Sequence, residues 1–162
     1  MKYKNKFKIC VIIVFCIFFL FVKKLYSAPT FEKEFLEIYN KNTTHCFEVY
    51  IADTHIKRQH GLMFVQELRE NMGMLFIYPR SQTVKMWMKN TLISLDMIFI
   101  KNNGKIVHIS KKTTPHDLTP IGPNAKVLGV LEIKGGLSEK LKIKSDSTIN
   151  HRVFNGNKKI KC

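Results

Sequence analysis

The sequence predicts a mainly β protein with one domain, built as a compact antiparallel β-sandwich or barrel with one or two short helices. Many short apolar segments follow one another at close spacing, and turn residues such as Gly, Pro and Asn separate them. No repeated β-α-β unit is present, which disfavours an open nucleotide-binding sheet. The length of 162 residues suffices for one core and is too small for two ordinary domains.

Residues 1–28 have the composition of a signal peptide or an N-terminal membrane anchor. A basic stretch from Lys2 to Lys8 precedes an uninterrupted apolar run from Ile9 to Val22. A stable membrane span takes about 20 residues, so this shorter run matches the apolar part of a signal peptide. Ser27 and Ala28 offer small residues for cleavage. We therefore predict export to the periplasm or the extracellular space, and retention as an inner-membrane anchor stays open.

The first half of the predicted body, residues 35–154, contains two strands and a short helix after a linker at residues 29–34. Apolar residues predict the strands at Phe35–Tyr39 and Phe47–Ile51. An oxygen-bearing side chain at Asp53 or Thr54 can cap a helix, and Gly61 is a typical helix end. The strands predicted next are Met74–Tyr78, which Pro79 closes, Val84–Met88 and Leu95–Ile100.

The second half of the body begins with a hairpin, because Asn103-Gly104 favours a tight turn between Leu95–Ile100 and a strand at Ile106–Ile109. The proline-containing stretch from Ser110 to Lys126 has no apolar period and predicts a long covering loop. A further strand is predicted at Val127–Ile133. Segments Leu141–Ile143 and His151–Phe154 are predicted to complete the sheet, and residues 155–162 form a polar, Lys-rich tail.

The charge is strongly basic, with 27 Lys and Arg against 12 Asp and Glu, a net charge of +15. The lysines are scattered, and only Arg58, Arg69, Arg80 and Arg152 are arginine. Specific nucleic-acid recognition favours arginine forks with interleaved aromatic residues, so the pattern disfavours a nucleic-acid partner. Weak attraction to an anionic envelope surface, or a generally soluble lysine-rich face, fits the composition better, and a monomer is predicted.

Outside the apolar N-terminal run, the cysteines are Cys46 and Cys162. An even pair in an exported protein permits one disulfide bond. Two free thiols, one of them on a flexible tail, are the other interpretation.

A polar cluster around the single tryptophan is the candidate binding site. If Met86 and Met88 point into the core, Trp87 points to solvent or a groove, where an indole flanked by lysines suits a ring or a sugar. The opposite interpretation buries the indole in a sheet that is covered on both sides. The candidate binding residues are Arg58, Gln59, Trp87, Lys89, Asn90, Thr91 and Asp96.

Asp96 lies in an apolar strand, where a buried carboxylate needs a partner. Arg58 could grip both carboxylate oxygens, either as a structural clamp or as part of a site for a small polar or anionic ligand. A weaker alternative is a Cu(I) site at Met86 and Met88, since thioethers are soft ligands. Otherwise the histidines and cysteines show no metal-ligand spacing and no catalytic motif, so no metal or other cofactor is predicted.

Several segments follow one another in a characteristic order: Arg58-Gln59-x-Gly61-Leu62-Met63, Gly73-Met74-Leu75-Phe76, Trp87-Met88-Lys89-Asn90-Thr91, Leu95-Asp96, Pro115 and the strand from Val127 to Gly136. In this order they resemble the DUF192 family of uncharacterised, often exported bacterial and archaeal domains. The resemblance implies a compact β domain and no known activity. Where the family commonly has phenylalanine and proline this chain has Met86 and Ser94, and Gly129 interrupts a strand.

Together these features predict a small exported module that binds a ligand or an envelope component at the polar corner of Trp87, Arg58 and Asp96. One alternative is an enzyme that uses Asp96 or His116 for proton transfer. Another is a structural partner of an envelope assembly.

Overall fold

The computed structural model describes residues 28–41, 43–155 and 159–162. The predicted signal peptide or anchor lies outside these residues, except for Ala28. Within the described ranges, no helix combines the length and the apolar character needed to cross a bilayer.

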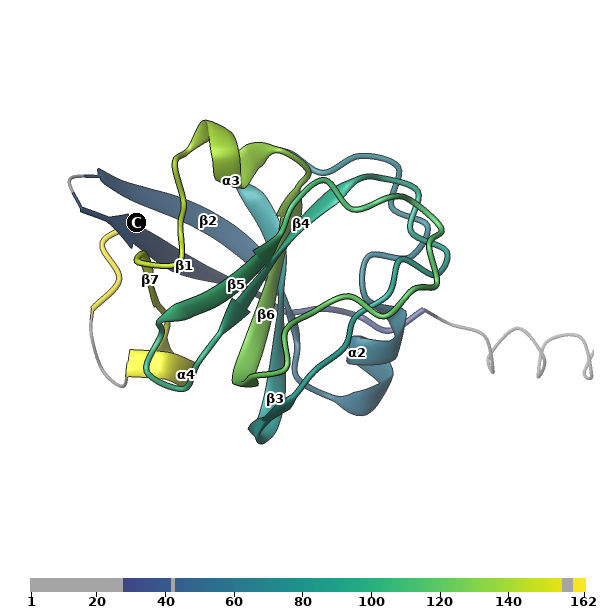
Figure 1. Ribbon diagram of the computed structural model, residues 1–162, viewed down its shortest axis with the longest axis horizontal. Helices are drawn as coiled ribbons and strands as arrows, with labels where there is room; N and C mark the ends of the chain where they lie inside the picture. The colour runs from purple at the N-terminus through teal and green to yellow at the C-terminus, as the bar shows by residue number, and fades with distance from the viewer. Residues whose placement is uncertain (1–27, 42, 156–158) are drawn as a thin grey trace, which may run out of the picture.

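A single curled sheet of seven strands forms a half-barrel, which confirms the predicted fold class (Figure 1). Its strands are β1 (Lys33–Asn40), β2 (Thr43–Ala52), β3 (Met72–Thr83), β4 (Leu95–Ile100), β5 (Ile106–Ser110), β6 (Lys126–Lys134) and β7 (Thr148–Asn150). The spatial order is β5-β4-β6-β3-β2-β1-β7, and all neighbours pair antiparallel except β2 and β3, which pair parallel. A bridge between Lys105 and Thr148 connects the two edges of the sheet.

Three short helices accompany the sheet in the described part of the chain: α2 (His55–His60), α3 (Leu137–Lys140) and α4 (Arg152–Asn155). The hydroxyl of Thr54 accepts a hydrogen bond from the Lys57 amide at the start of α2. Gly61 ends the helix with a positive φ of 51°, which glycine adopts readily. Both signals for this helix were visible in the sequence.

Alternation along the strands divides the apolar side chains between two clusters. In β6, Leu131 and Ile133 join the cluster that α3 and α4 help to cover. Val130 joins the cluster on the other face, which the segment after α2 and the loops following β3 and β5 cover. Glu132 follows the period of Val130, and its register partners Met74 and Met97 belong to that second cluster. A carboxyl group therefore stands on a face otherwise made of apolar side chains.

Several predicted element boundaries were wrong. β1 begins at Lys33, inside the predicted linker, and β3 continues past Pro79 to Thr83. Residues 84–88 form no strand and keep only one bridge, from Met86 to Ile121. The predicted strand at His151–Phe154 is largely helix α4, and β7 occupies Thr148–Asn150 instead.

Gly129 has a packing reason within β6. A Cβ atom at this position would lie 2.8 Å from Cζ of Phe154 and 3.0 Å from the carbonyl oxygen of Phe76. The missing side chain therefore lets the Phe154 ring of α4 close over the strand.

Candidate functional site

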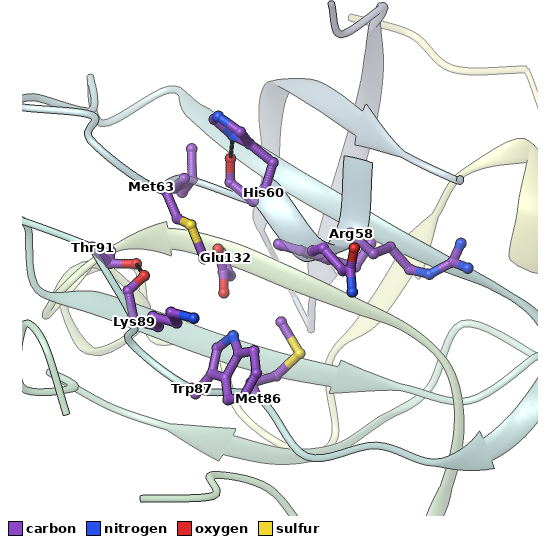
Figure 2. Close-up of a pocket in the computed structure, with 12 residues that line it drawn as sticks. Arg58, His60, Met63, Met86, Trp87, Lys89, Thr91 and Glu132 are labelled. Atoms are coloured by element: carbon purple, nitrogen blue, oxygen red, sulfur yellow. Dashed lines mark hydrogen bonds between the residues drawn. The ribbon is translucent and has the colours of Figure 1, made fainter. Parts of the chain in front are cut away.

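A small pocket lies between the end of α2, the segment that follows it, and residues 86–91 (Figure 2). Its volume is about 30 Å³, which by this measure is room for roughly two water molecules or one small functional group. The lining residues are Arg58, Gln59, His60, Gly61, Leu62, Met63, Phe76, Met86, Trp87, Lys89, Thr91 and Glu132.

Glu132 is the most unusual residue of this pocket. Its exposed fraction is 4%, and no described residue gives its carboxyl group a hydrogen bond or an ion pair. Burial raises the pKa of Glu132 from its ordinary value of 4.5 to about 8. The group is therefore mostly protonated at neutral pH, and can both donate and accept a hydrogen bond.

Trp87 and Lys89 form one side of the pocket, and Figure 2 shows the Glu132 carboxyl between them and Met63. Trp87 is 52% exposed, so the open interpretation of its position holds rather than the buried one. The ammonium nitrogen of Lys89 lies 5.8 Å from the centroid of the indole, a favourable cation–π contact. The pocket thus combines an aromatic surface, a cation and a protonated acid.

The two walls of the pocket are held together at Asn90. This residue has a positive φ of 54°, and its carbonyl oxygen accepts a hydrogen bond from the amide of Phe64 at 2.9 Å. Asparagine tolerates this left-handed conformation better than most residues. Asn90 is absent from the pocket lining and fixes its shape from behind, as the turn character of the Lys89-Asn90-Thr91 segment indicated.

Arg58 does not meet Asp96. Its guanidinium group donates to the main-chain oxygens of Asp53 and Ile77, and lies 5.2 Å from the centroid of the Tyr78 ring. In Figure 2 the guanidinium points away from the pocket. The expected pairing of Arg58 with Asp96 was therefore wrong, and Arg58 fastens α2 to β3.

Asp96 is fully buried and has its own set of partners. Oδ1 accepts from the amides of Lys112 and Gly136 at 2.8 and 2.9 Å, and Oδ2 accepts from the amide and the hydroxyl of Ser138 at 2.8 and 2.6 Å. These bonds join β4 to the loop after β5 and to the start of α3. Hydrogen bonds of this number and geometry explain how a carboxylate is tolerated without a countercharge. Asp96 is absent from the pocket lining.

The two methionines considered for copper have different partners. Met88 is fully buried, and its sulfur accepts a hydrogen bond from the hydroxyl of Thr113 at 3.2 Å. Met86 lines the pocket, and its sulfur lies 3.5 Å from the hydroxyl of Tyr78. Met88 thus belongs to the core, whereas Met86 and Met63 are the thioethers of the pocket.

His116, the other residue considered for proton transfer, lies exposed in the loop after β5 with a positive φ of 63°. It is absent from the pocket lining, although its amide donates to the carbonyl of Thr91. The loop therefore supports the pocket through its main chain.

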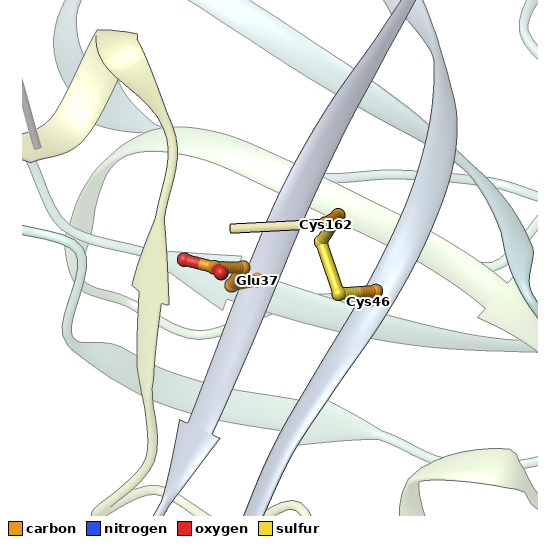
Figure 3. Close-up of side chains that lie close together, drawn as sticks. All are labelled: Glu37, Cys46 and Cys162. Carbon is orange, nitrogen blue, oxygen red and sulfur yellow. A yellow bond between two sulfur atoms is a disulfide. The ribbon is translucent and has the colours of Figure 1, made fainter. Parts of the chain in front are cut away.

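Cys46 and Cys162 form a disulfide bond, with Cα atoms 5.9 Å apart. The bond holds the end of the chain beside β1 and β2, where Glu37 lies nearby (Figure 3). Ligand atoms of these three residues lie within 4.8 Å of one another. Because the two sulfurs bond to each other, they are not thiolates available to a metal. Glu37 already accepts from Tyr39, Asn150 and the amide of Lys161.

A second, mainly apolar pocket of about 240 Å³ shares His60, Gly61 and Leu62 with the first. Phe31, Tyr50 and several aliphatic side chains line it, and its acid, Glu67, is exposed. It lacks the unpartnered buried group that distinguishes the pocket of Glu132.

The fold and the sequence segments identify the family. The model of DUF192, described as Uncharacterized ACR, matches residues 37–151. The chain belongs to the DUF192 family. No curated protein matches the chain. One similar solved structure is a protein of Sinorhizobium meliloti 1021 named as a "putative transcription regulator", with 30% identity and a TM-score of 0.74 over 76% of this chain and 97% of that one.

A second similar structure is a protein of unknown function from Novosphingobium aromaticivorans DSM 12444. It has 30% identity and a TM-score of 0.72, covering 78% of this chain and 94% of that one. The family gives the fold, and its description names no activity.

Of the seven residues predicted for the site, Arg58, Gln59, Trp87, Lys89 and Thr91 line the pocket, and Asn90 and Asp96 do not. Glu132, His60 and Met63 line the pocket but were not predicted from the sequence. Glu132 carried a usable signal, because it interrupts an apolar strand as Asp96 does.

Proposed function

We propose that this DUF192 protein is an exported module that binds a small saccharide of the cell envelope. In this proposal the sugar ring lies against Trp87, and one ring substituent enters the pocket and hydrogen-bonds with Glu132. The observation that carries the proposal is the carboxyl of Glu132, a residue that is 4% exposed, lines the pocket and has no hydrogen bond or ion pair with any described residue. A buried polar group without a partner is costly, so a ligand that supplies the partner gains affinity there.

A neutral hydroxyl group suits this pocket better than a charged group. Protonated Glu132 can donate to a hydroxyl oxygen and accept from its proton, which a single hydroxyl group can satisfy. Lys89 at the rim disfavours an ammonium group by like-charge repulsion and can donate to a second hydroxyl. The volume of about 30 Å³ admits one substituent and leaves the ring outside, next to the exposed indole.

Trp87 makes a direct test available, because it is the single tryptophan of the chain. Fluorescence titrations with glucose, galactose, glucosamine and N-acetylglucosamine are expected to change the Trp87 emission for at least one sugar. In Glu132→Leu, the affinity for that sugar is expected to fall by roughly tenfold, since leaving a buried hydroxyl group without its partner costs about 1–3 kcal/mol.

The matched control is Glu139→Gln, an exposed glutamate that pairs with Lys112 outside the pocket. It is expected to bind as the wild type does. Glu132→Leu removes a buried polar group, so its melting temperature is expected to stay at or above that of the wild type. No emission change with any of the sugars, or equal affinity in Glu132→Leu and wild type, would contradict the proposal.

The raised pKa of Glu132 favours a second candidate function, a general acid that cleaves a glycosidic bond. Glycosidases of the common kind need a second carboxylate, and within the described lining Glu132 is the only acid. Binding without turnover is therefore our first choice. If the wild type releases reducing sugar from an envelope oligosaccharide and Glu132→Gln does not, hydrolysis replaces binding as the preferred function.

A further inference from the structure

The loops around the pocket expose most of the large apolar side chains that are exposed in the described residues. Seven such side chains are exposed, and four of them are Phe64 at 63%, Trp87 at 52%, Leu92 at 41% and Leu118 at 63%. We call these four the loop face. We propose that the loop face docks onto an anionic lipid bilayer, with its apolar side chains at the level of the lipid headgroups. This proposal does not rest on the proposed function, and because both use the exposed indole of Trp87, a bilayer on the loop face and a sugar ring on Trp87 exclude one another.

The three segments that carry the loop face lie side by side, because main-chain hydrogen bonds join them. The amide of Phe64 donates to Asn90, two residues before Leu92. The amide of Met88, next to Trp87, donates to the carbonyl of Asp117, the residue before Leu118. Figure 1 shows these loops gathered at the end of the molecule away from β7 and α4.

The charges around the loop face suit an anionic surface. Residues 61–71, 84–94 and 111–125, the three segments of the loop face, contain Arg69, Lys85, Lys89, Lys111 and Lys112 against Glu67, Glu70 and Asp117. Five positive charges minus three give +2 for these segments. Tryptophan and phenylalanine beside lysines are typical of membrane interfaces, where the rings lie among headgroups and the lysines meet anionic lipids.

Trp87 also reports on this proposal, since its emission is quenched when the indole meets bromine atoms on lipid chains. The full chain is reconstituted with phosphatidylglycerol-containing vesicles that carry brominated acyl chains near the headgroups. We expect the Trp87 emission to shift to shorter wavelength and to fall by more than half. In the double variant Phe64→Ser/Leu118→Ser, which changes exposed side chains, most of this quenching is expected to disappear at unchanged melting temperature.

The control is Phe35→Ser, which changes a side chain that is 51% exposed on β1 and outside the loops. It should be quenched like the wild type. An indole that stays unquenched by brominated lipid and open to aqueous iodide overturns the proposal. So does a lipid-free dimer in sedimentation that shields Trp87, because the loop face is then a protein interface. Glu132→Leu, which tests the pocket, is expected to leave the quenching by lipid unchanged.

Discussion

Asp96 and Glu132 are two buried acids on neighbouring strands with opposite surroundings. Their register positions are adjacent, because Asp96 pairs with Ile133 and Glu132 pairs with Met97. Asp96 accepts four hydrogen bonds, whereas Glu132 has no hydrogen bond or ion pair from any residue that the structure describes. The difference separates a structural acid, whose partners are built into the fold, from a buried acid that the described residues leave without a partner.

Of the substitutions that test this difference, removing the Asp96 carboxylate is expected to lower the stability of the protein most. Asp96→Ala leaves three amides and the hydroxyl of Ser138 buried without an acceptor. We expect the free energy of unfolding to fall on the order of 5 kcal/mol, measured by urea denaturation.

Asp96→Asn keeps one oxygen acceptor, so a smaller loss of about 3 kcal/mol is expected from it. This variant keeps the test informative if the alanine variant does not fold. A change below about 1 kcal/mol for both variants would mean that the Asp96 bonds are not structural.

The next largest effect is the pH dependence that Glu132 causes. Its pKa is raised by burial from 4.5 to about 8, so the folded protein holds this proton more tightly than the unfolded chain does. The contribution of this proton to the unfolding free energy is complete below about pH 4.5 and is lost as the pH rises to about 8. Glu132→Gln lacks this loss. Between about pH 4.5 and 8, its unfolding free energy is therefore expected to rise relative to that of the wild type by on the order of 4 kcal/mol.

Denaturation curves of wild type and Glu132→Gln at several pH values between 4.5 and 8.5 measure this shift. The exposed substitution Glu139→Gln is the control and should run parallel to the wild type over this range. If the Glu132→Gln curve also runs parallel to the wild type, Glu132 is not the desolvated acid described above.

The smallest effect is expected from a substitution that removes one of the partners of Asp96. Ser138→Ala deletes the hydroxyl that donates to Oδ2 at 2.6 Å and leaves the amide of residue 138 in place. A loss of about 1.5 kcal/mol in unfolding free energy is expected, since one charge-assisted bond is removed. An unchanged stability would show that the three main-chain amides suffice for Asp96.

Local signals explain how much of this protein could be predicted. The caps at Thr54 and Gly61, the hairpin at Asn103-Gly104 and the apolar strands all follow from residues next to one another in the chain. Errors arose where distant contacts overruled a local pattern, as at Arg152–Asn155, where a helix closes over Gly129 instead of a strand. The alternation that placed Trp87 outside held even though its segment is not a strand.

The sequence by itself determined the family, the β architecture and the residues that gather around Trp87, because periodicity, turns and motifs are local. Only the tertiary structure decided which partner each buried acid meets. The partners of Asp96 are 16 to 42 residues away, and two of its three amides belong to residues whose side chains give no hint of it. The same long-range packing brought Cys162 to Cys46 and left Glu132 facing a pocket, since burial and hydrogen bonding depend on the whole assembled sheet.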